Sequence, residues 1–311
     1  NYTLFMESQE SGGFNVHTAN NDATQIMCIN QTVKNPILRE FFQNANCRKA
    51  MSLAINREEI IDLIYSGLTT PRQYSPSNAS PQYYQKLSDA YIEYDPDTAN
   101  AMLDAEGYTE RDAEGFRMFK DGSGPVTFIL EDNSAPFIDE MEMIAKYLAD
   151  VGIKMLPKIL ERSLVEEHCQ ANEIDARFTL ASRAALPLVD PAFFIGRAGD
   201  KSWGYGWTIW YNDPSNPNAE EPPEGGMAKS MWEIWDRIKI EPDVTKHTAM
   251  FHEILDIHYE YLPYIGISGE QPALIIMNKN LKNLPIDYHM PWSNPIQHDG
   301  FIQLQTFFWE E

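Results

Sequence analysis

The sequence is poor in cysteine, in basic residues and in long apolar runs. Its 311 residues include three cysteines, Cys28, Cys47 and Cys169, which are too few and too scattered for a disulfide framework or a zinc cluster. Lys and Arg number 24 against 46 Asp and Glu, for a net charge of −22. So acidic a surface repels nucleic-acid phosphates and anionic lipid headgroups, and we expect neither as a partner. No run approaches the roughly 18 apolar residues of a membrane span.

Catalytic motifs are also scarce. The chain has no Gly-x-Ser-x-Gly elbow, no phosphate-binding P-loop and no dinucleotide fingerprint. His252 and Glu253 are similar to the start of a zinc-binding helix motif, but Asp256 stands where the second histidine is needed. We therefore expect no metal and no cofactor. With 46 acidic residues, some pairs of carboxylates could be spaced as glycoside hydrolysis requires, but no feature of the sequence distinguishes one such pair.

What the chain has is apolar and aromatic residues, 43 % and 12 % of the total, enough for one large domain or two ordinary ones. Apolar runs at Val126–Leu130, Ile153–Leu160 and Asp175–Leu180 alternate with stretches of helical spacing. This order predicts an α/β fold in which helices cover a sheet.

Local patterns predict the ends of several elements. Helix starts are expected at capping boxes Asn56/Glu59 and Ser163/Glu166 and at the Asp-Pro steps 95–96 and 190–191. Two long helices follow over residues 227–238 and 244–261. Strands are expected at Tyr2–Met6, Gln25–Asn30, Tyr264–Ser268 and Ala273–Met277, and Phe301–Trp309 alternates like an edge strand.

Residues 186–223 lack periodicity and are dense in aromatic residues, Gly, Pro and Asn, which predicts a long loop of functional type. Trp203, Trp207 and Tyr211 are candidate ligand contacts, because rings on a glycine-flexed loop offer stacking faces to sugars or peptide side chains. The alternative is that these rings fill the core of their own domain. Trp210 is expected to be structural.

Arg183 is a second kind of candidate. It lies three residues past the end of the strand Asp175–Leu180, and α/β sheets place ligands beyond that end of a strand. An arginine there can clamp a carboxylate with two hydrogen bonds. The alternative is an ordinary salt bridge in an acidic protein.

Three motifs resemble those of the family 5 solute-binding proteins, the oligopeptide/dipeptide type that serves ABC importers outside the cytoplasm. The first joins Asn35-Pro36 to the stretch 47–67, with Asn56 where the family usually has Asp. The second begins at Tyr94-Asp95-Pro96 and runs to Gly107-Tyr108, and the third is Val189-Asp190-Pro191. The resemblance covers about residues 15–311.

The resemblance implies a lobe like those of type II periplasmic binding proteins, with a mixed sheet covered by helices. Family members begin with another lobe that has no counterpart here. We therefore expect residues 1–30 to be a hinge-crossing segment with a remnant of the first lobe, 31–267 the second, ligand-binding lobe, and 268–311 the return crossing with a further remnant. By the same resemblance, Arg72 and Tyr74 lie on a cleft-lining loop, and Tyr264 lies at the return crossing.

The implied function is capture of a peptide or oligosaccharide by lobe closure and its delivery to a membrane permease, without catalysis. The expected protein is a monomer located outside the cytoplasm, in the periplasm or lipid-anchored on the outer face of the cell membrane. One departure matters: peptide binders carry an Asp where this chain has Pro187, so no carboxylate there pairs with a peptide ammonium. Oligosaccharide and other solutes gain accordingly.

Two alternatives stay open at this point. One is a secreted carbohydrate-active hydrolase that uses paired carboxylates. The other is a receptor-coupled sensor module of the same fold.

Overall fold

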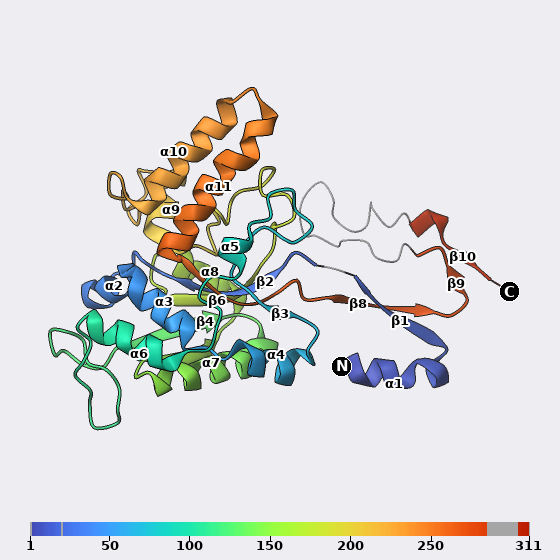
Figure 1. The fold of residues 1–311 in the computed structure, drawn as a ribbon, viewed down its shortest axis with the longest axis horizontal. Coiled ribbons are helices and arrows are strands. Elements are labelled where there is room, and N and C mark those ends of the chain that lie inside the picture. Colours follow the sequence, from blue (N-terminus) through green and yellow to red (C-terminus); the bar gives the residue numbers. More distant parts are fainter. Residues whose placement is uncertain (1, 20, 285–303, 311) are drawn as a thin grey trace.

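The computed structural model describes residues 2–19, 21–284 and 304–310. They form a lobe around a six-stranded sheet, and a narrow arm projects from it (Figure 1). In order across the sheet the strands are β3 (Thr70–Pro71), β7 (Tyr264–Gly269), β2 (Thr24–Ile29), β6 (Ala176–Ala181), β4 (Thr127–Asp132) and β5 (Lys154–Ile159). Strands β6, β4 and β5 are parallel, whereas β2 and β7 are antiparallel to their neighbours. The expected mixed sheet is confirmed.

Helices cover both faces of the sheet, because β2 is apolar on both sides. Met27 and Ile29 point into one core, and Ile26 and Cys28 point into the other. The first core is closed by α2 (Pro36–Gln43), α3 (Ala45–Leu53), α4 (Arg57–Tyr65), α6 (Pro96–Ala105) and α7 (Ile138–Asp150). The second is closed mainly by α5 (Gln85–Ser88), α9 (Tyr205–Asn212), α10 (Met227–Ile240) and α11 (Val244–Tyr261), and α8 (Arg162–Gln170) packs with α9 on a smaller third cluster.

Two of the expected helix starts are confirmed, and two are wrong. The side chain of Asn56 accepts the Glu59 N–H, and that of Asp95 accepts the Thr98 N–H. Helix α8 instead begins at Arg162 without a side-chain cap, and Glu166 pairs with Arg162 at 2.7 Å. Asp190-Pro191 opens a turn in place of a helix, in which the Ile195 N–H reaches the Pro191 carbonyl at 3.0 Å.

The segment 186–223 is only partly a loop. Residues 205–212 form α9, which corrects the expectation of a glycine-flexed loop around the aromatic residues. The helix is apolar on nearly every side, so it has no periodic signal, and it is stabilised by burial of its first turn in the lobe.

The arm contains the two ends of the described chain. Helix α1 (Tyr2–Gly12) replaces the strand expected at residues 2–6, because the helix formers Met6–Glu10 extend the run and no sheet partner covers it. Strands β1 (Phe14–Ala19) and β8 (Ala273–Asn278) form an antiparallel ribbon, and β9 (Leu281–Lys282) pairs with β10 (Phe308–Trp309). Leu304–Thr306 is a short 3-10 helix, and residues 301–303 of the expected edge strand lie outside the described residues.

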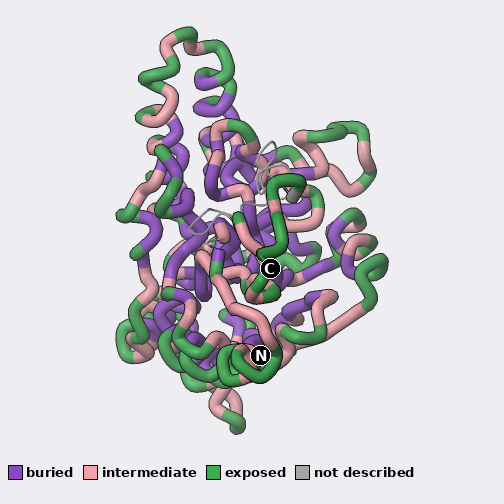
Figure 2. Tube along the Cα trace, turned by 90° about the vertical axis from the view of Figure 1, so that its right-hand side faces the viewer, coloured by how far each residue is buried: buried purple, intermediate pink, exposed green. Residues whose placement is uncertain are grey.

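The arm is far less buried than the lobe. Helix α1 has no buried residue, and Leu274, Ile276, Phe308 and Trp309 all present exposed side chains. Figure 2 looks toward the arm and shows exposed and half-buried segments around both chain ends in front of the buried lobe.

Candidate functional site

One edge of the six-stranded sheet carries both the strand ends and the arm. Thr24 at the start of β2 pairs with Ala181 at the end of β6 and with Gly269 at the end of β7. Strand β4 runs parallel to β6, so Asp132 at its end lies at the same edge. Open α/β sheets bind ligands beyond the carboxyl ends of their strands.

A groove of about 340 Å³ lies at this edge. Three cationic side chains, two carboxylates and one phenyl ring contribute to it, from β6, α8, the loop after β4 and the segment 200–201. The lining residues are Asp132, Asn133, Ser134, Phe137, Arg162, Arg177, Thr179, Leu180, Asp200 and Lys201. In a chain with 46 acidic and 24 basic residues, this excess of cations is local.

Arg177 on β6 holds the two walls of the groove in place. Its guanidinium donates to the side-chain oxygen of Asn133 at 3.0 Å and contacts the Asp200 carboxylate at 3.3 Å. It also donates to the Asp200 carbonyl. Because Arg177 is almost wholly buried, these contacts fix the loop after β4 and the segment at residue 200 relative to the strand.

Asp132 and Lys201 line the groove with polar groups that do not bond to Arg177. Burial raises the pKa of the Asp132 carboxyl, against the N–H groups of Asn133 and Ser134, which lower it. One Asp132 oxygen, Oδ2, is buried with no hydrogen-bond partner among the described residues. The Lys201 ammonium donates to the Leu180 carbonyl at 3.1 Å, and burial lowers its pKa. An ammonium has three donors, so Lys201 can bind further acceptors.

Phe137 adds an apolar surface. Its ring packs edge-on against Phe178 with the centroids 5.8 Å apart. Phe137 also lines the groove, together with the polar side chains of Asp132 and Lys201. A ring next to hydrogen-bond donors and acceptors suits a polar solute with an apolar face, such as a sugar or a peptide.

Four of the residues predicted from sequence lie together in the second core. Tyr74 stacks on Phe194 at 4.7 Å, lies edge-on to Tyr264 at 5.7 Å, and donates its hydroxyl to the Ser182 carbonyl at 2.7 Å. Trp203 and Trp207 are also buried and meet edge-on at 6.0 Å. All four rings belong to one apolar cluster. For the two tryptophans this matches the alternative expectation, that their rings fill the core of their own domain.

The other three lie at the surface of that core or beside the segment that follows β7. Tyr211 on α9 is half-buried beneath the Arg197 guanidinium, which lies 4.6 Å from its ring centre. Arg183 pairs with Asp190 at 2.9 Å, and Arg72 pairs with Glu270 at 2.8 Å. Contact of any of the seven with ligand stays a prediction. Trp210, expected to be structural, stacks on Trp232 with the rings 4° from parallel.

The groove residues were missed by the sequence interpretation. Its rule about strand ends was applied to Arg183 after β6, and the same rule applied to β4 points to Asp132 and the residues that follow. No sequence signal marks Lys201, which reaches the groove through a turn-rich segment. Among the described residues, no three His, Cys, Asp or Glu side chains group so as to hold a metal ion, and no helix is long and apolar enough to cross a membrane.

Residues 3–218 match the family described as "Bacterial extracellular solute-binding proteins, family 5 Middle". The chain belongs to this family. The three motifs at residues 35–67, 94–108 and 189–191 all lie within the matched range, so the resemblance seen in the sequence is confirmed.

Curated relatives of this family 5 chain differ in what their names say they bind. A periplasmic alpha-galactoside-binding protein of Rhizobium meliloti is 20 % identical over 259 residues, covering 80 % of the chain and 35 % of the relative. A putative ABC transporter peptide-binding protein of Brucella ovis is 30 % identical over 122 residues, covering 39 % of the chain and 20 % of the relative.

Similar solved structures are also named for a peptide ligand in one case and a sugar ligand in another. An oligopeptide-binding protein OppA superposes with a TM-score of 0.82 and 30 % identity, over 100 % of this chain and 51 % of that one. The binding protein MelB of Agrobacterium fabrum, solved with stachyose, superposes with a TM-score of 0.74 and 17 % identity, over 93 % and 45 %. The second likeness shows the fold alone. This family 5 chain thus spans about half the length of the solved chains it matches.

Proposed function

We propose that this chain is the second lobe of a solute-binding protein of an ABC importer, and that the groove beside Lys201 is its share of the ligand site. The observation that carries the proposal is the common edge: the groove and the arm both lie where β4, β6 and β7 end. A ligand in the groove would therefore face whatever packs on the arm. No bond is made or broken, and no cofactor takes part.

The proposed mechanism is hinge closure. Residues 21–23 and 270–272 join the lobe to the arm, and we assign the arm to the other lobe of a longer protein. This refines the division expected from sequence, because strand β2, within residues 1–30, lies in the middle of the sheet of the second lobe. Exposed apolar side chains on β8 and β10 support the assignment, since a second lobe would cover them. Ligand would select the closed arrangement by touching both lobes.

The proposed ligand is an oligosaccharide or a peptide, with the oligosaccharide favoured. Vicinal hydroxyls both donate and accept, so they match Asp132 Oδ2 and the free donors of Lys201, with the sugar face on Phe137. Pro187 is buried and has no charge to hold a peptide ammonium. The name of the α-galactoside-binding relative supports the same choice, whereas the relatives named for peptides keep the peptide as the second candidate.

We further propose that the full protein is a monomer outside the cytoplasm, in the periplasm or held by a lipid anchor, and that it delivers its solute to a membrane permease. Membership of a bacterial extracellular family supports the location.

The test is binding by the full-length protein. Calorimetry with stachyose, with β-linked oligosaccharides and with di- to penta-peptides should show that one of these ligand classes binds with a fixed stoichiometry. The bound ligand should be recovered chemically unchanged. Lys201→Met should weaken that binding by about tenfold, the worth of one buried charged hydrogen bond. Lys34→Met is the matched control, because Lys34 pairs with Glu173 on the surface. Cleavage of the sugar, or equal affinity in both variants, would refute the proposal.

A further inference from the structure

Each of the two segments that join lobe and arm carries a carboxylate that is bonded to a loop of the lobe. On the outgoing segment, Asp22 accepts the Ala185 N–H at 3.1 Å. On the returning segment, Glu270 accepts the Asn78 N–H at 2.6 Å and pairs with Arg72 at 2.8 Å. Both attachments lie at the end of the sheet that carries the groove.

The two attachments are linked into a closed circuit. The loops meet where the Ser77 N–H donates to the Ala184 carbonyl at 2.9 Å. The joining segments meet where the Glu270 N–H donates to the Ala23 carbonyl at 2.9 Å. We call this ring of contacts, made by residues 22–23, 72–78, 184–185 and 270, the collar.

Most of the collar is buried and tightly packed, whereas Asn78 is exposed and Glu270 is half-buried. Asp22 is 1 % exposed, and the side chain of Arg72 is 3 % exposed. Glu270 has a φ of +56°, a left-handed conformation that disfavours a glutamate and persists only where contacts enforce it. The Arg72 side chain fills the space where a Cβ of Gly269 would lie, 2.0 Å from its Cδ atom, so the position beside Glu270 requires glycine.

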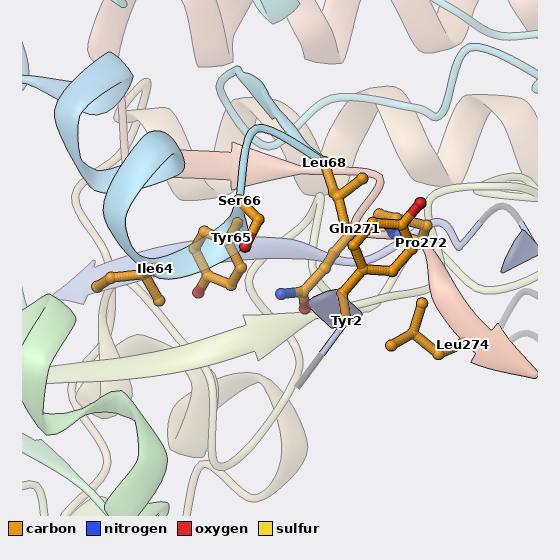
Figure 3. A pocket seen from close by; sticks show the side chains of 8 residues that line it. All are labelled: Tyr2, Ile64, Tyr65, Ser66, Leu68, Gln271, Pro272 and Leu274. Carbon is orange, nitrogen blue, oxygen red and sulfur yellow. The ribbon is translucent and has the colours of Figure 1, made fainter. Parts of the chain in front are cut away.

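Beyond the collar the packing is looser. Gln271 and Pro272 border a hollow of about 160 Å³, together with Tyr2 from the arm and Tyr65, Ser66 and Leu68 from the lobe (Figure 3). Figure 3 shows the Gln271 side chain beside Tyr2, with its amide directed toward Tyr65. The chain therefore passes from a fixed ring to a region with room to move.

We propose that the collar positions the hinge: the joining segments move with the lobe as far as Asp22 and Glu270, and bending takes place on the arm side, at Asn21 and at Gln271 and Pro272. Glu270 and Asp22 are its positioning residues. The biological role of the hinge rests on the proposed function. The claim that the collar is one rigid unit concerns the contacts of this chain alone. The circuit also includes Ala184, next to Arg183, so the edge of the lobe that faces the ligand is held by the same ring.

Amide hydrogen exchange on this chain tests whether the collar is one unit. Glu270→Ala should speed exchange of the Asn78 N–H, its direct donor, and also of the Ala185 N–H on the opposite side, each by roughly tenfold or more. Glu270→Gln keeps the acceptor and loses the charge, and should give a smaller effect at both. Amides of β4 and β5 should keep their protection, which distinguishes local opening from unfolding. Glu173→Ala, which removes a surface ion pair, is the control and should change none of these amides.

An unchanged Ala185 amide beside a deprotected Asn78 amide would overturn the proposal, because the contacts would then be separate. In the full-length protein without ligand, two spin labels, one in each lobe, should report a broader distance distribution for Glu270→Ala than for the control. An unchanged distribution would also overturn it. If the full-length protein binds no solute, the proposed function fails, whereas the exchange result stands by itself.

Discussion

The hydroxyl of Tyr65 donates a 2.6 Å hydrogen bond to the carboxyl of Glu140, which is wholly buried beneath the sheet edge. Gln25 in turn donates to the Tyr65 oxygen at 3.0 Å. Burial raises the pKa of Glu140 to about 7, and the negative charge of Asp132 adds to the effect, against the hydrogen bonds from Tyr65 and Gln25. This buried acid is bonded to Tyr65, which lines the hollow beside Gln271, and is influenced by Asp132, which lines the groove.

The Glu140 carboxyl should make stability depend on pH. Its pKa is about 7 in the folded chain against an ordinary 4.5, so the folded state holds the proton more tightly. The stabilisation is complete below pH 4.5 and is lost as pH rises through 7, by about 3 kcal/mol in total. Denaturant unfolding of the wild type and of Glu140→Gln across pH 4–8 measures it as the difference between the two.

The control is Glu142→Gln, on the exposed side of the same helix. Its unfolding free energy should follow that of the wild type at each pH. A constant difference between wild type and Glu140→Gln across the whole range would contradict the assignment of the proton to Glu140.

His258 should act in the opposite direction. Its Nε2 contacts the Phe194 carbonyl at 2.6 Å, and because a carbonyl only accepts, Nε2 carries the proton. Burial lowers the pKa of His258 from 6.5 to about 4, so its contribution to stability is present above pH 6.5 and lost as pH falls toward 4. NMR of the imidazole nitrogens should show His258 neutral at pH 5. A half-protonated ring near pH 6.5 would contradict the burial argument.

Arg57 should be a residue of stability, although it lies in the motif by which the family is recognised. Its buried guanidinium donates to the carbonyls of Gly266, at 2.9 and 2.8 Å, and of Ser52, at 2.8 Å. Arg57→Met leaves these carbonyls without donors and should lower the free energy of unfolding by about 3–5 kcal/mol. The exposed Arg237, paired with Glu253, is the matched control, and its replacement by Met should cost less than about 1 kcal/mol. Equal losses in both variants would be the contrary result.

The scaffold was predictable because its signals are local. A cap such as Asn56 and a buried strand such as residues 127–132 are specified by residues a few positions apart, and the sequence interpretation found both. The family motifs are predictable for the same reason, since Arg57 and Asp95 fix helices and loops of the lobe.

The groove was not predictable because its parts are far apart in sequence. Asp132, Arg177 and Lys201 come from three segments that the parallel order of β4 and β6 brings to one edge. Aromatic residues misled the prediction of α9, because the rings at residues 205, 207, 210 and 211 are spread over most of the helix surface and leave no periodic pattern. Tyr205 is buried against α8, and Trp210 and Tyr211 pack on Trp232 of α10, elements that no local signal connects to α9.

Trp203 should therefore contribute strongly to the stability of the fold. It is 1 % exposed and packs closely on Gly196, whose added Cβ would lie 2.4 Å from the indole ring. Trp203→Ala should lower the free energy of unfolding by about 3–5 kcal/mol through the cavity it leaves. Thermal and denaturant melts check this, with Trp309→Ala as the control, because Trp309 on the arm is 65 % exposed. A Trp203→Ala chain as stable as the wild type would place the indole outside the core.

The chain by itself should bind solute weakly. The groove is one wall of the proposed ligand site. The apolar side chains of β8 and β10 are exposed, so among the described residues no second lobe covers them. Affinity depends on contacts from both sides and on exclusion of water, so we expect binding at least about 100-fold weaker than that of the full-length protein for the same oligosaccharide or peptide. Calorimetry of the two proteins side by side measures the ratio. Sub-micromolar affinity of this chain would mean that the lobe closes a site without a partner, and hinge closure would then not be the source of binding.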